Sequence, residues 1–183
     1  MARTPTASPS PHAGITLVEV IVCTCVFSIL AAIATPAMAG LIERQRAIAA
    51  ENMLVTHLAL TRMTAITHRS LAVMCPSSDG ATCDAGTDWS GGWLLFLDRD
   101  GNRRPDQPEH ILRSDRMPIP RNLRLVSSTG RPQVRYLADG RSAGTNLTIS
   151  VCNTKGDLLA SVIVNSAGRT RSTWPAKPTS CPA

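Results

Sequence analysis

Apolar positions along the chain fall into three stretches with different periods. The first is residues 15–38, where 24 residues contain a single charged side chain, that of Glu19. At 1.5 Å per helical residue, this stretch is long enough to cross a hydrocarbon layer about 30 Å thick. It therefore predicts a transmembrane helix. Pro36 should kink that helix, because proline removes one backbone hydrogen bond and crowds the carbonyl of the preceding turn.

The second stretch, residues 39–70, is amphipathic. Its apolar positions recur at three-, four- and seven-residue spacings, as on one face of a helix. The predicted stripe consists of Leu41, Ile48, Val55, Ala59 and Ile66, widened by Leu54, Leu58 and Ala65. Most charged positions should lie on other faces: Glu43, Arg44, Arg46, Glu51 and Arg62. We therefore expect one continuous helix of about 55 residues, whose second half has a single buried face.

The third stretch, residues 71–183, changes to short apolar runs separated by clusters of Gly, Asn, Asp and Pro. Six runs are expected to form strands: residues 71–75, 92–98, 123–127, 134–137, 147–152 and 159–165. A long helix followed by strands predicts an α+β fold, in which an antiparallel sheet packs against the apolar stripe of the helix.

Charge is spread unevenly along the chain. The formal net charge is +6, but residues 75–115 carry −4 and residues 116–183 carry +8. A strongly basic segment favours an anionic partner such as nucleic acid, lipid headgroups or an acidic protein face. A solvated surface is the alternative, since arginine accounts for 17 of the 19 basic residues.

The six cysteines form two groups. Cys23 and Cys25 lie in the apolar run, where a thiol behaves as a small hydrophobe. The other four allow three connectivities: Cys75, Cys83, Cys152 and Cys181. A bridge across the Pro-, Ser- and Gly-containing segment 75–83 is geometrically easy and would leave residue 152 to tether the C-terminal tail through residue 181. Disulfides imply an oxidising compartment, and the absence of a CxxC pair argues against zinc.

An acidic loop at residues 98–109 places hard oxygen ligands around a glycine. These ligands suit calcium: Asp98, Asp100, Asn102 and Asp106. The spacing does not match an EF-hand loop, whose glycine is the sixth residue, and a hairpin tip explains the same residues. Calcium is thus an alternative at this loop, and no other cofactor is expected.

Histidines are scattered rather than gathered into a catalytic set. His12 precedes the apolar run, His57 and His68 fall on the predicted helix, and His110 follows the acidic loop. We expect them to be surface or packing residues. No phosphate-binding glycine loop or dinucleotide fingerprint is present, so the sequence does not favour an enzyme.

The start of the apolar run reads GITLVEV, followed by an apolar stretch and Pro36. It resembles the class III signal of type IV pilins and type II secretion pseudopilins. The resemblance implies that a prepilin peptidase removes residues 1–14, cutting after Gly14 and N-methylating Ile15. Glu19 would then guide assembly with other subunits. A carboxylate inside a membrane is energetically expensive, and the new amine of a neighbouring subunit would neutralise it.

The resemblance continues into the third stretch. The segments LALTRMTAITHR, VMCPSSDGATC and DWSGGWLLFLDRDGN are similar to the GspH/FimT family of minor pilins and pseudopilins. This implies a type IV pilin-like fold, with a single-pass anchor in the bacterial inner membrane and a head of residues 71–183 in the periplasm or on a filament. Trp89 and Trp93 belong to the same pattern and are expected to be core and turn anchors.

Near the C-terminus, residues 168–171 read GRTR. They resemble the GRxR motif of FimT-type minor pilins, which bind DNA during natural transformation. The resemblance implies contacts from Gly168, Arg169 and Arg171 to double-stranded DNA. On an extended segment both guanidiniums face the same way and reach one strand of phosphates, while Trp174 would stack on a base or cover the sheet. We expect a DNA-binding pilus subunit. The alternative is a GspH-like pseudopilin of a type II secretion system.

Overall fold

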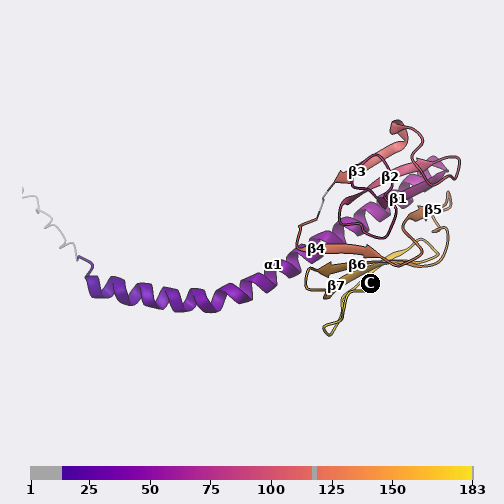
Figure 1. The fold of residues 1–183 in the computed structure, drawn as a ribbon. Helices are drawn as coiled ribbons and strands as arrows, with labels where there is room; N and C mark the ends of the chain where they lie inside the picture. Colours follow the sequence, from indigo (N-terminus) through magenta and orange to yellow (C-terminus); the bar gives the residue numbers. More distant parts are fainter. Residues whose placement is uncertain (1–13, 117–118, 183) are drawn as a thin grey trace, which may run out of the picture. The chain divides into compact units, whose positions relative to one another are not determined.

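The computed structural model describes residues 14–116 and 119–182 (Figure 1). Of the predicted leader, only Gly14 lies within these residues, and His12 lies outside them. The chain forms two units, Met1–Leu41 and Ile42–Ala183, which we describe separately.

A single helix, α1, runs from Leu17 to His68 and continues through position 36. By length and composition it is able to cross a membrane. Its C-terminus is set by Arg69, whose φ of 48° is in the left-handed region. The amide of Ser70 then donates to the carbonyl of Ala65, a bond that closes the last turn. The helix thus ends two residues before the predicted boundary.

Residues 42–183 hold two four-stranded antiparallel sheets, which Figure 1 shows beside the second half of α1. The first has the order β3-β2-β1-β5, with strands β1 Leu71–Pro76, β2 Gly92–Asp98, β3 Ile111–Arg116 and β5 Val134–Tyr136. The second has the order β4-β6-β7-β8, with strands β4 Leu123–Ser127, β6 Leu147–Asn153, β7 Leu158–Val164 and β8 Thr170–Thr173. A short 3-10 turn, η1 Pro108–His110, precedes β3.

The predicted α+β class is confirmed, because one long helix packs on antiparallel strands. The prediction of six strands in one sheet is wrong in two respects. Two sheets form instead of one, and β3 and β8 were not predicted. Both are edge strands of their sheets, and most of their side chains are exposed. Strands of this kind bury no regular apolar face, so their sequences, ILRSDR and TRST, lack the alternation that marks a half-buried strand.

The buried face of α1 agrees with the predicted stripe only in part: Leu54, Leu58 and Ala65 are buried as predicted, whereas other positions differ. Its centre is formed by Ala47, Ala50, Leu54, Leu58 and Ala65, all at most 2% exposed. The predicted Leu41 and Ile66 are 52% and 41% exposed, whereas Glu51, expected on another face, is buried. Three of these central positions are alanine, and two of them, Ala47 and Ala50, lie outside the predicted stripe.

One core joins the helix to both sheets. It contains Trp89 and Trp93, which are buried as predicted, together with residues of β1, β2 and β4–β7. Two disulfides close the periphery of this unit. One links Cys75 of β1 to Cys83, and the other links Cys152 of β6 to Cys181 in the C-terminal tail. This is one of the three connectivities that the four cysteines allow.

Candidate functional site

The helix that would anchor the chain begins with a side-chain cap. Thr16 immediately precedes α1, and its Oγ1 accepts a hydrogen bond from the backbone amide of Glu19 at 3.3 Å. A Thr followed three residues later by Glu is the sequence of a capping box, and an acidic side chain in the first turn also interacts favourably with the helix dipole. Glu19 is therefore a helix-start residue in the isolated chain. The sequence TLVE carried this signal, although the sequence analysis missed it.

Hydroxyl groups in the apolar half of α1 are satisfied within the helix. The bonds run to carbonyls of the preceding turn: Thr24 to Val20 at 3.0 Å and Ile21 at 2.9 Å, Ser28 to Thr24 at 2.7 Å, and Thr35 to Ala31 at 2.6 Å. In a medium without water, an unsatisfied polar group costs several kcal/mol. These internal bonds fit the apolar half to such a medium.

The GRTR segment lies at the turn between β7 and β8. The backbone closes this turn twice: Gly168 donates to the Asn165 carbonyl at 2.9 Å, and Asn165 donates to the Arg169 carbonyl at 3.1 Å. The side chain of Asn165 closes it a third time, because its Oδ1 accepts from the Arg169 amide at 2.9 Å. The backbone of Arg169 is therefore fixed by hydrogen bonds within a well-defined turn.

Gly168 is required by the packing of this turn. Its φ is 75°, and a Cβ at this position would lie 2.0 Å from the carbonyl oxygen of Gly140. Arg62 of α1 donates from Nε to the same oxygen at 2.8 Å and from Nη2 to the Ala167 carbonyl at 3.4 Å. One helical arginine thus holds two turns of the head together.

Strand alternation turns Arg171 of β8 away from the helix, and Arg169 lies in the turn immediately before this strand. Between them Thr170 is half-buried, and the Ser172 hydroxyl donates to the carboxylate of Glu51 on α1. The even-numbered positions therefore face the helix and the odd-numbered ones face away from it. Both arginines are exposed, and within the described residues neither guanidinium has a hydrogen bond or an ion pair.

Trp174 follows the hairpin and lies beside the helix. It shares a surface pocket with Arg44, Ile48, Glu51 and Asn52, all from α1. Both roles expected for this side chain, stacking on a base and covering the sheet, stay predictions. The indole remains 41% exposed.

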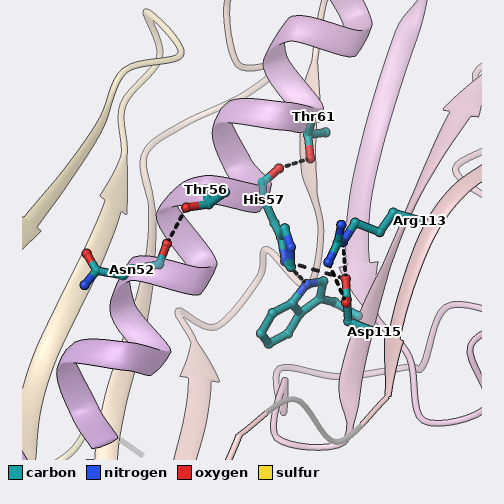
Figure 2. A network of polar contacts seen from close by, with 7 residues as sticks. Asn52, Thr56, His57, Thr61, Arg113 and Asp115 are labelled. Atoms are coloured by element: carbon teal, nitrogen blue, oxygen red, sulfur yellow. Dashed lines mark hydrogen bonds and ion pairs between the residues drawn. The ribbon is translucent and has the colours of Figure 1, made fainter. Parts of the chain in front are cut away.

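His57 is the buried centre of a polar network that extends to the surface at Arg113 (Figure 2). Its Nδ1 accepts a hydrogen bond from Trp93 Nε1 at 2.7 Å and lies 3.6 Å from Oδ2 of Asp115, which Arg113 binds through two hydrogen bonds. Burial lowers the pKa of His57 below its usual 6.5, and this effect exceeds the opposing attraction of Asp115. The imidazole is therefore neutral at neutral pH, and the network joins α1 to β2 and β3 as packing.

The acidic loop uses its oxygen atoms for its own turn. The side-chain Nδ2 of Asn102 donates to the carboxylate of Asp100 at 2.8 Å and to that of Asp106 at 2.6 Å. The backbone amide of Arg103 donates to the carboxylate of Asp98 at 3.3 Å. Burial raises the pKa of Asp98. Across residues 14–116 and 119–182, no group of three or more His, Cys, Asp or Glu side chains is placed to hold a metal ion. Calcium binding here stays a prediction.

Comparison with known proteins adds to this picture. A family model described as "Type II transport protein GspH" matches residues 50–168. Among curated proteins, none matches the chain in sequence. The matched region ends at Gly168, immediately before the arginine pair, so the family match does not extend to those two side chains.

Three solved structures share the fold. The type IV minor pilin FimU of Pseudomonas aeruginosa has a TM-score of 0.59 at 20% identity, over 76% of this chain and 97% of that chain. The minor pseudopilin EpsH from the type 2 secretion system of Vibrio cholerae has a TM-score of 0.51 at 15% identity, over 72% and 99%. E. coli GspH has a TM-score of 0.52 at 16% identity, over 72% and 90%.

Proposed function

The chain belongs to the GspH family of minor pilins and pseudopilins, and from that premise we propose that it is a minor pilin subunit that contacts double-stranded DNA through its β7–β8 hairpin. Members of the family assemble with other pilin or pseudopilin subunits. The family consists of structural subunits and not of enzymes, and we infer no catalytic activity for this chain.

In this proposal the first half of α1 anchors the subunit in the bacterial inner membrane and places the head in the periplasm or on a filament. A prepilin peptidase cuts after Gly14 and methylates Ile15. Support comes from the apolar side chains of this half, which are exposed in the single chain, among them Leu17 at 75% and Phe27 at 72%. Lipid or the helices of neighbouring subunits would cover them.

The DNA contact rests on one observation: Arg169, just before β8, and Arg171, within it, are both exposed, and within the described residues neither has an acidic partner. They lie in the basic third of the chain, where the balance of charge is +8. Paired guanidiniums of this kind bind phosphate oxygens, and phosphate contacts are independent of base sequence. The expected binding is therefore weak and salt-dependent.

The experiment is a titration of the full chain, in non-ionic detergent, with duplex DNA at two salt concentrations. We expect log K to fall as log salt rises. Replacing both arginines, Arg169→Ala and Arg171→Ala, should weaken binding and reduce the slope by about two, roughly 0.9 for each lost phosphate contact.

A matched control removes two arginines elsewhere in the head. Arg121→Ala and Arg124→Ala delete the same charge from exposed positions, one just before β4 and one within it, and β4 is the opposite edge strand of the sheet that contains β8. This variant should keep a slope close to that of the wild type. Equal losses in both variants, or no binding by the wild-type chain at low salt, would refute a specific role for the hairpin.

The second candidate is a pseudopilin of a type II secretion system. It is favoured by the description of the matching family and by the likeness to EpsH. The two candidates share processing, anchoring and assembly. They differ in the partner of the head, so a chain that restores secretion but does not bind DNA would support this candidate.

A further inference from the structure

A second basic site lies away from the hairpin, in a cavity of about 250 Å³ beside β5. Three arginines line it: Arg103, Arg131 and Arg135. Gln133 and Thr145 are the other polar side chains at its wall, and no acidic residue of the described chain lines it. Three like charges around one cavity repel one another, and an anion between them would offset this repulsion by attracting all three.

Arg131 is held in place by the backbone around it. Its Nη2 donates to the carbonyl of Ala143 at 2.7 Å, and the Ala143 amide donates to the carbonyl of Arg135 at 2.8 Å. The next residue, Gly144, has a φ of 106°, and a Cβ there would lie 3.3 Å from the guanidinium carbon. A glycine thus leaves room for the guanidinium, and the site is positioned before any ligand arrives.

The charge of Arg131 is poorly compensated. Within the described residues its Nη1 is buried and has no hydrogen-bond partner. Burial lowers the pKa of Arg131, and the neighbouring positive charge of Arg135 lowers it further. A partly buried cation beside a second cation is costly, and an adjacent anion offsets that cost.

We propose that this cavity binds a phosphate group through Arg103, Arg131 and Arg135. Guanidiniums are suited to phosphate because their planar fork of N–H donors matches its oxygen atoms. Three positive charges favour a doubly charged phosphate over a singly charged carboxylate. The cavity is smaller than typical pockets for drug-sized ligands, which fits a small group. Free phosphate and the phosphate monoester of a lipid headgroup share this chemistry.

The proposal does not depend on DNA binding, because neither Arg169 nor Arg171 lines the cavity. Its test is calorimetric titration of inorganic phosphate into the full chain in non-ionic detergent. We expect saturable binding by the wild type and an affinity about tenfold lower in Arg135→Gln, since a hydrogen bond to a charged group is lost. Arg131→Lys retains the charge but not the fork, and should also bind about tenfold more weakly.

Two variants serve as controls. Arg124→Gln removes one charge outside the cavity, and the double replacement Arg169→Ala and Arg171→Ala removes the hairpin pair. Both should bind phosphate within about twofold of the wild type. Melting curves in phosphate-free buffer verify that each variant is folded, and if Arg131→Lys is not, the test rests on Arg135→Gln.

Two further ligands complete the experiment. Acetate, a singly charged carboxylate, tests whether the site prefers a doubly charged anion. If acetate bound with the same affinity as phosphate, the proposal would be overturned. Glycerol phosphate tests the source: tighter binding than inorganic phosphate points to a headgroup, and equal binding points to free phosphate, provided that Arg135→Gln weakens both. Absence of saturable phosphate binding, or an equal loss in Arg124→Gln, would also overturn the proposal.

Discussion

Gly168 combines a left-handed backbone with close contact to a neighbouring carbonyl. Its φ is 75°, and a Cβ would lie 2.0 Å from the Gly140 oxygen. Gly168→Ala should therefore lower the free energy of unfolding by about 2 kcal/mol or more, through backbone strain and displacement of the turn. The measurement is chemical denaturation followed by tryptophan fluorescence, which reports on the buried Trp89 and Trp93.

Gly156 provides the matched control for this substitution. It has a similar φ of 88°, but nothing lies within 4 Å of a Cβ added there. Gly156→Ala should cost only the backbone strain, about 1 kcal/mol. Equal losses of stability in Gly168→Ala and Gly156→Ala would show that the contact between the turns at residues 168 and 140 contributes nothing to stability.

Protonation of His57 should destabilise the head in acid. Burial lowers its pKa in the folded chain, so between that value and the unfolded value of 6.5 the unfolded chain binds more protons. Stability therefore rises with pH in this window and falls as the pH drops below 6.5. The loss is at most about 1.4 kcal/mol per pH unit. Denaturation at pH 7.5 and pH 5.5 measures it, above the range in which ordinary carboxylates titrate.

The variant His57→Gln removes the titrating group while leaving an oxygen that can accept from Trp93. Its stability should change less between the two pH values than that of the wild type. If His57→Gln lost as much stability between pH 7.5 and pH 5.5 as the wild type, the loss would come from a group other than His57.

At the scale of the elements, the helix offers two leucines of opposite exposure. Leu58 is fully buried, whereas Leu60 is 42% exposed. Leu58→Ala should lower the free energy of unfolding by about 2–5 kcal/mol, because it leaves a cavity in the core. Leu60→Ala should cost less than about 1 kcal/mol. Thermal and chemical unfolding measure the stability of both variants. A larger loss of stability in Leu60→Ala than in Leu58→Ala would show that the buried face of the helix lies elsewhere.

The predictability of each element followed its burial. The helix and six strands were predicted because their apolar runs are long or alternate regularly. The stripe of α1 was partly misplaced because alanine at positions 47 and 50 carries little weight in a pattern of large apolar residues, although both alanines belong to the buried core. Such choices depend on the partner surface, which sequence periodicity does not contain.

The candidate site was partly predictable for the same reason. Arg169 and Arg171 were recognised from a local motif and strand alternation. The contacts of Arg62 with Gly140 and Ala167 join segments that are 78 and 105 residues apart. Likewise, Arg103 lies 28 residues before Arg131 in the sequence, and the two meet at the cavity only through the fold.

At the scale of the whole molecule, we propose that Glu19 connects the chain to neighbouring subunits. Glu19→Ala should leave the head folded, since residues 42–183 form their own unit, but should impair incorporation into filaments by removing the partner of the Ile15 amine. Immunoblots of sheared filaments measure incorporation. Glu43→Ala, on the same helix outside the apolar half, is the control and should assemble normally. Normal incorporation of Glu19→Ala would remove the assigned role.

The central claim is that the chain works as an anchored subunit made from a processed precursor. The most direct measurement is the intact mass and N-terminal sequence of the protein isolated from the membranes of its host. We expect a chain that begins at Ile15 and carries one added methyl group on its amine. A chain that retains residues 1–14, or one cut within residues 34–40 so that the apolar half is lost, would contradict it.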